Sequence, residues 1–144
     1  MEWQEERSPT EKRLRILLAE DDHDLRLHYH LTLIHAGYQA ETAEDGAAAW
    51  DMLQVSRYDL LITDNEMPRV SGVQLLERLR SARIAMPVIM AARLFPAFPF
   101  GRGPWLRYSA TISKPFTGEA LLLLVSRVLA AAAGRPKQEH FSRR

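Results

Sequence analysis

Short apolar runs alternate along the chain with longer segments in which apolar residues recur at helical spacing. Apolar runs of about four to eight residues, bounded by acidic or turn-forming residues, are typical of buried strands. Strands that alternate with helical segments predict a parallel sheet, because each parallel pair needs a crossover connection. The runs that we assign to strands are Leu14–Ala19, Tyr38–Thr42, Leu60–Asp64, Pro87–Ala91 and Ala110–Ser113.

The segment after the first run has the pattern of a helix. Within residues 24–36, Leu27, Leu31 and Ile34 fall on one helical face, which is the spacing of a helix packed against a core. Gly37 follows at the position where a glycine commonly ends a helix. We therefore expect a helix between the first two strands.

Three further segments are predicted helices. One is the Ala-rich segment 47–55, and two follow Ser71 and Thr117, whose hydroxyl groups can cap a helix. Alternation also predicts a helix within residues 93–105, but three prolines and two glycines in that segment oppose a long one. We expect a short or irregular element there.

Composition is that of an ordinary globular protein and narrows the classes of partner. The 144 residues suit one domain, for which we predict limits of 13–131, between an N-terminal tail 1–12 and a basic C-terminal tail 132–144. The absence of cysteine excludes disulfides and thiolate metal sites. A net charge of +1 favours neither nucleic acid nor a membrane surface, and no apolar stretch is long enough to span a bilayer. We expect a cytoplasmic protein without nucleic-acid or membrane binding.

Charged side chains stand at the carboxyl ends of three predicted strands. Glu20, Asp21 and Asp22 follow the first run, Asp64 ends the third, and Lys114 follows the fifth. In an open parallel sheet the ligand crevice lies at these ends. Carboxylates that meet there repel one another unless a cation neutralises them. Mg²⁺ suits this role because it binds oxygen and needs few protein ligands.

This arrangement predicts phosphoryl chemistry at Asp64. A carboxylate is a competent nucleophile towards phosphorus, and Lys114 with a bound cation would stabilise the charge on the transferred group. A hydrolase that forms an aspartyl phosphate would use similar acids, but such enzymes usually carry a second Asp where this chain has Glu66. We therefore expect a phosphoacceptor, not a conventional enzyme. Asp22 and Asp45 are interpreted as helix caps.

Three motifs of the chain resemble those of the receiver domain of bacterial response regulators. They are ILLAEDD at 16–22, YDLLITDNEMPRVSG at 58–72 and SKPF at 113–116. The second is the most specific, since a strand ending in Asp is followed by Met-Pro and then by Gly four residues beyond the Pro. The resemblance covers residues 14–129. It implies a doubly wound, flavodoxin-like α/β fold with five parallel strands in the order 2-1-3-4-5, here with a short or irregular fourth helix.

The resemblance also assigns roles to individual residues. Asp64 would be the phosphoacceptor and a metal ligand, and Lys114 would contact the phosphoryl group. Asp21 would bind Mg²⁺ directly, Glu20 would assist through water or a hydrogen bond, and Glu66 would supply its backbone carbonyl. The implied phosphodonor is a sensor histidine kinase or a histidine phosphotransfer protein. The downstream protein is not specified, and a homodimer stays open.

Two positions depart from the family pattern. Receivers usually carry Ser or Thr at the end of the fourth strand, where this chain has Ala92, and an aromatic residue in the fifth strand, where it has Thr111. Thr63 and Ser113 each adjoin a pocket residue on a strand, so we expect them to point to the opposite face. Two hypotheses therefore stay open: a phosphorylated receiver with an altered output, and a degenerate pseudo-receiver that docks to partners independently of phosphorylation.

Overall fold

Five parallel strands with helices on both faces make up residues 13–93 and 109–134, the part of the chain that the computed structural model describes. The sheet has the order β2-β1-β3-β4-β5. The strands are β1 (Arg15–Ala19), β2 (Gln39–Ala43), β3 (Leu60–Asp64), β4 (Val88–Ala92) and β5 (Ala110–Ser113). The helices are α1 (His23–His35), α2 (Gly46–Val55), α3 (Gly72–Ser81) and α4 (Gly118–Ala133). The predicted fold class and strand order are confirmed.

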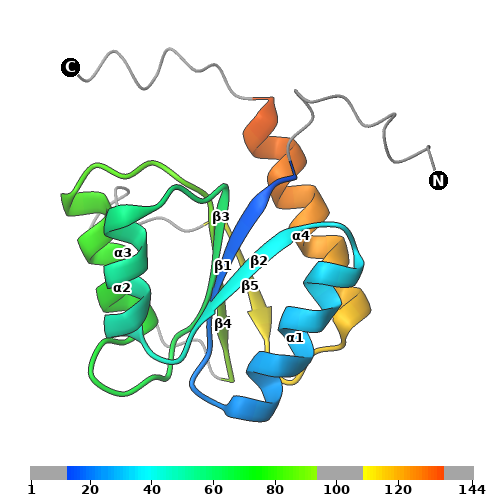
Figure 1. Ribbon diagram of the computed structural model, residues 1–144, viewed down its shortest axis with the longest axis horizontal. Helices are drawn as coiled ribbons and strands as arrows, with labels where there is room; N and C mark the ends of the chain where they lie inside the picture. The colour runs from blue at the N-terminus through cyan, green and yellow to red at the C-terminus, as the bar shows by residue number, and fades with distance from the viewer. Residues whose placement is uncertain (1–12, 94–108, 135–144) are drawn as a thin grey trace.

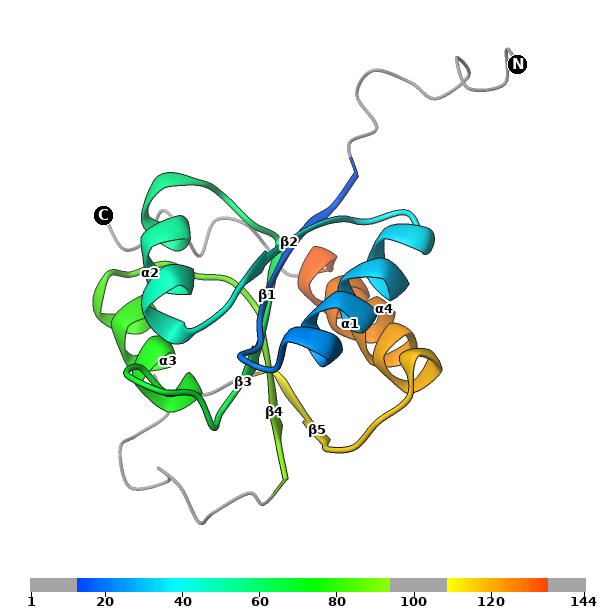
Figure 2. The same cartoon turned by 60° about the horizontal axis from the view of Figure 1, so that its bottom comes forward.

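The helices form one layer on each face of the sheet (Figure 1). Helices α2 and α3 cover one face and α1 and α4 the other, as a view turned by 60° also shows (Figure 2). Side chains alternate between the two cores along each strand. In β3, Leu61 packs beneath α2 and α3, whereas Leu60 and Ile62 pack beneath α1 and α4. The chain changes sides between β1 and β3, which places the ligand crevice of such a sheet at their carboxyl ends.

Side-chain caps start all four helices of the described residues. Asp22 and Asp45 accept hydrogen bonds from the backbone at the starts of α1 and α2. Ser71 forms a capping box with Gln74 in α3, and the Thr117 hydroxyl accepts a hydrogen bond from the first turn of α4. These caps were predicted from the sequence, and those of α1 and α2 fix the helix starts beside the ends of β1 and β2.

The buried face of α1 differs from the predicted one. Tyr29 and Leu33 face the core, whereas the stripe of Leu27, Leu31 and Ile34 is 40–49% exposed. The prediction that this stripe packs inward was wrong. Tyr29 and Leu33 also lie four residues apart, and spacing alone cannot rank two overlapping stripes on one helix.

Several predicted segments lie outside the described residues. They include residues 94–105 of the predicted irregular element and, at the two ends, residues 1–12 and 135–144. Helix α4 continues to Ala133. Within the described ranges, no helix combines the length and the apolar character that crossing a bilayer requires.

Candidate functional site

The strand ends bring together three charged side chains that are far apart in the sequence. Glu20 directly follows β1, Asp64 ends β3, and Lys114 directly follows β5. The Nζ atom of Lys114 lies 3.1 Å from Oδ2 of Asp64 and 3.3 Å from Oε1 of Glu20. Both carboxylates are only 3% exposed. The sequence-predicted acids and lysine therefore form one buried cluster.

A third carboxylate extends this cluster towards solvent. Asp21 is exposed, and one carboxylate oxygen from each of Glu20, Asp21 and Asp64 lies within 4.8 Å of the others. The backbone amide of Glu66 donates to Oδ1 of Asp64 at 3.4 Å, so the loop after β3 also borders the acids. Three carboxylates against one lysine leave an excess of negative charge. Because every donor is an oxygen, the set fits a hard divalent cation such as Mg²⁺.

Burial and charge shift the protonation equilibria of the cluster. Burial raises the pKa of Asp64 to about 6, the nearby charge of Glu20 raises it further, and Lys114 opposes both effects. Burial alone would lower the pKa of Lys114, but Asp64 and Glu20 outweigh burial and raise it. At neutral pH the site therefore holds a cationic lysine beside a buried, ionised carboxylate that has few water molecules to displace.

The loop after β3 packs closely against the backbone of Asp64. A Cβ atom on Gly72 would lie 2.7 Å from the carbonyl oxygen of Asp64 and 2.7 Å from Sδ of Met90, so only glycine fits without a shift. Asn65 accepts two hydrogen bonds at 3.1 Å, one on its carbonyl oxygen from the Gly72 amide and one on its side-chain oxygen from the Val73 amide. These contacts hold the start of α3 against the end of β3 and so fix Asp64.

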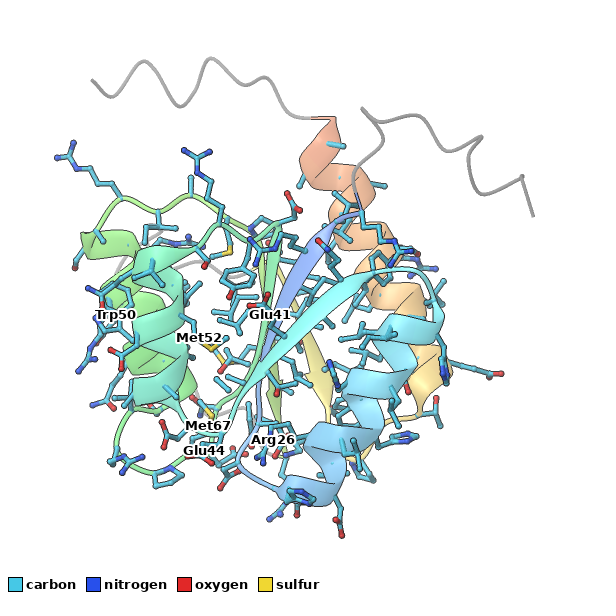
Figure 3. The ribbon with its side chains drawn as sticks, viewed as in Figure 1. Arg26, Glu41, Glu44, Trp50, Met52 and Met67 are labelled. Carbon is cyan, nitrogen blue, oxygen red and sulfur yellow. The ribbon has the colours of Figure 1, made fainter. Side chains whose placement is uncertain are left out.

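Two arginines that no sequence motif singles out hold the neighbouring loops. The Nη1 atom of Arg26 donates to the carbonyl oxygen of Glu20 at 2.9 Å. Figure 3 shows Arg26 near the end of β1. The guanidinium of Arg69 contacts the carboxylate of Asp45, the N-cap of α2, and ties the loop after β3 to that helix. Arg26 lies on the first turn of α1, so its reach back to the strand end follows from the sequence only once the helix start is known.

The hydroxyl groups around the site do not replace the one missing at the end of β4. Ala92 is fully buried and carries no hydroxyl, and Thr111 in β5 is exposed. Thr63 is also fully buried, and its hydroxyl donates to the carbonyl oxygen of Asp64 at 3.0 Å. Ser113 is exposed. The nearest buried hydroxyl in sequence therefore serves the backbone of Asp64, not its carboxylate.

Comparison with known sequences gives a match over most of the chain. The family described as response regulator receiver domain matches residues 16–126. The transcriptional regulatory protein RprY of Bacteroides fragilis is 30% identical over 135 residues, which are 90% of this chain and 55% of RprY. The response regulator receiver protein CpdR of Brucella abortus is 32% identical over 120 residues, which are 82% of this chain and 98% of CpdR. The chain thus spans about half of RprY and nearly all of CpdR.

A solved structure shows the same fold. The chemotaxis response regulator CheY4 of Vibrio cholerae superimposes with a TM-score of 0.73 and 29% sequence identity, covering 81% of this chain and 99% of that chain. The similarity therefore extends over nearly the whole of that regulator.

Proposed function

This chain belongs to the response regulator receiver domain family, and from that membership we propose that Asp64 is its phosphoacceptor. One observation carries the proposal. The carboxylate of Asp64 is nearly buried, lies 3.1 Å from the Lys114 ammonium group, and shares its surroundings with Glu20 and Asp21. A nucleophile, a fixed positive charge and a set of metal-binding oxygens thus meet at one point, which are the parts that phosphoryl transfer requires.

In the proposed reaction, a carboxylate oxygen of Asp64 attacks the phosphorus of the donor. The new oxygen–phosphorus bond forms as the bond from phosphorus to the leaving atom breaks, and the leaving group keeps the electron pair. Lys114 is already beside Asp64 and donates a hydrogen bond to a phosphoryl oxygen. Glu20, Asp21, Asp64 and the backbone carbonyl of Glu66 are the proposed ligands of Mg²⁺. When bound, Mg²⁺ supplies positive charge for the phosphoryl oxygens.

The proposed donor is a sensor histidine kinase or a histidine phosphotransfer protein, because a phosphohistidine carries a transferable phosphoryl group. Such donors place the reaction in the cytoplasm. We further propose that residues 13–131 act as one receiver unit with tails at 1–12 and 132–144, which signals to a downstream protein by contact, as a monomer or a homodimer. Receiver domains are in general not conventional enzymes, and we expect no turnover of small phosphate esters.

A second candidate function rests on Ala92. That residue is fully buried and offers no hydroxyl to a phosphoryl oxygen, and the hydroxyl of Thr63 is engaged by the backbone. A lost hydrogen bond to a charged group costs about 1.5–3 kcal/mol. If phosphorylation at Asp64 is correspondingly weak, the domain acts as a pseudo-receiver that docks to its partner in the unphosphorylated state.

One experiment separates the two functions. The protein is incubated with Mg²⁺ and acetyl phosphate, and intact-mass and peptide mass spectrometry follow the addition of one phosphoryl group. We expect the addition on Asp64 in the wild type and in Asp51→Asn, which removes an exposed aspartate of α2. We expect none in Asp64→Ala. An unmodified wild type, or a modification that persists in Asp64→Ala, would overturn the proposal in favour of the pseudo-receiver or of another acceptor.

A further inference from the structure

Tyr29 connects α1 to the turn that follows β5. It is the buried aromatic residue of α1, 3% exposed. Its ring stacks on the ring of Phe116, with centroids 4.6 Å apart and an angle of 16° between the planes. Its hydroxyl donates to the backbone carbonyl oxygen of Phe116 at 3.3 Å. Tyr29 therefore holds Phe116 through both its side chain and its backbone.

The residue held in this way lies two positions after Lys114. On the other side of the turn, the backbone amide of Lys114 donates to the carbonyl oxygen of Ala92 at 3.0 Å. The backbone of the Lys114–Phe116 turn is thus fixed by β4 at its start and by Tyr29 at its end. A lysine side chain has many rotamers, so the position of its ammonium group depends on how firmly its backbone is held.

The hydroxyl of Tyr29 also lies within the electrostatic reach of the acid cluster. Burial raises the pKa of Tyr29, Lys114 opposes this rise, and Glu20 adds to it. The hydroxyl therefore stays protonated, and able to donate its hydrogen bond, throughout the neutral range. Three charged or polar groups from β1, α1 and the turn after β5 are consequently coupled around Lys114.

We propose that Tyr29 is a positioning residue for phosphoryl transfer: from α1 it fixes the Lys114–Phe116 turn, so that the lysine Nζ atom is held beside Asp64. This inference rests on the proposed phosphoacceptor function and deepens it. Tyr29 itself touches neither Asp64 nor the transferred group. Its effect on the reaction passes through Lys114, which distinguishes it from a residue that only contributes to the core.

The test compares variants that remove one or both contacts. Tyr29→Phe keeps the ring and loses the hydrogen bond, and Tyr29→Leu loses both. With acetyl phosphate and saturating Mg²⁺, we expect the rate of Asp64 phosphorylation to fall about threefold to tenfold in Tyr29→Phe, the effect of one hydrogen bond, and further in Tyr29→Leu. Tyr38→Phe, a partly buried tyrosine of the same core, serves as the matched control and keeps the wild-type rate.

A double variant distinguishes positioning from a general effect on the fold. In a Lys114→Ala background, Tyr29→Phe has no lysine left to position, so its additional effect on the rate should vanish. An equal loss of rate in both backgrounds, or no loss in either, would overturn the proposal.

A second measurement needs no phosphorylation. The acylation rate of Lys114 by an amine-reactive ester is followed by mass spectrometry, with Lys12 and Lys137, the other two lysines of the sequence, as internal references. We expect labelling of Lys114 to be severalfold faster in Tyr29→Phe than in the wild type. Unchanged labelling would overturn the positioning role. If the wild type labels as expected but is never phosphorylated, the proposed function fails while the positioning of Lys114 stands.

Discussion

The ammonium group of Lys114 and the carboxylate of Asp64 form an ion pair, 3.1 Å between Nζ and Oδ2, from which water is nearly excluded. The same ammonium group also pairs with Oε1 of Glu20. In the described residues, the lysine therefore contacts two of the three carboxylates that we assign to the metal. Lysine and metal compete for the same oxygens, and this competition determines the consequences of changing either side chain.

Replacing Lys114 by methionine should separate metal binding from phosphoryl transfer. Methionine has a similar length but no charge, so Asp64 and Glu20 lose a competing cation and we expect Mg²⁺ to bind about tenfold more tightly. Phosphorylation by acetyl phosphate should fall about a hundredfold, because the transferred group loses a charged donor. Calorimetric titration with Mg²⁺ and a mass-spectrometric time course measure the two effects.

The control for Lys114→Met is Arg127→Met, which removes an exposed cation of α4. Its Mg²⁺ affinity and phosphorylation rate should match those of the wild type. A parallel fall of both quantities in Lys114→Met would contradict the competition between lysine and metal.

The raised pKa of Asp64 predicts a pH-dependent cost in stability without Mg²⁺. The pKa is about 6 in the folded protein against 3.8 as the ordinary value. Between about pH 4 and pH 6 the folded state therefore binds more protons than the unfolded state, so the free energy of unfolding falls as pH rises, and levels off above the folded pKa. The total decline is on the order of 1–3 kcal/mol.

Urea denaturation at a series of pH values in EDTA measures this decline. Asp64→Asn should lack it and should be more stable than the wild type at pH 7. Saturating Mg²⁺ should reduce it, because the metal favours the ionised carboxylate. Asp45 and Glu41 have lowered pKa values, so their contributions are lost only at lower pH and with the opposite sign. A wild type whose stability rises steadily from pH 4 to pH 7 in EDTA would contradict the burial of an ionised Asp64.

The charged cluster was predictable because it depends on residue type and on the ends of strands. Glu20, Asp64 and Lys114 each follow or end an apolar run, and the parallel topology brings such positions to one edge. The caps at Asp22 and Ser71 were predictable for a similar reason, since capping is a contact within a few residues.

Contacts between distant elements were not predictable in this way. Tyr29 and Phe116 are 87 residues apart and meet because α1 lies beside the turn that leads into α4. Their stacking also explains why the Tyr29 face of α1, and not the Leu27 face, is buried. The sequence shows both stripes on α1 but not the neighbour that selects between them. The contact of Arg69 with Asp45 likewise depends on how the loop after β3 approaches α2.

Adding a methyl group at Gly72 should destabilise the protein and the metal site together. The new Cβ atom of Gly72→Ala would meet the carbonyl oxygen of Asp64 at 2.7 Å, so strand or loop must shift. Overpacking of this kind costs about 1–3 kcal/mol. Urea denaturation should show that loss, and Mg²⁺ titration should show weaker binding.

Gly134→Ala is the matched control for Gly72→Ala. There the nearest atoms to an added Cβ are 3.8 Å away, and the position is the C-cap of α4. We expect its stability to change by less than about 1 kcal/mol. A Gly72→Ala variant as stable as Gly134→Ala would contradict the close packing beneath Asp64.

Restoring a hydroxyl at position 92 should strengthen the binding of a phosphoryl analogue. Ala92→Thr places a hydroxyl at the end of β4, beside the strand that carries Asp64. A hydrogen bond to a charged group is worth about 1.5–3 kcal/mol, so beryllofluoride should bind about tenfold or more tightly in the presence of Mg²⁺. Ala92→Val has the same shape without the hydroxyl, and both variants share the cost of filling a fully buried position. Fluorescence or NMR titration of the two variants against the wild type therefore isolates the hydroxyl. If Thr and Val bind the analogue equally, position 92 does not reach the anion. If neither variant nor the wild type binds it at all, the pseudo-receiver is the better account of this domain.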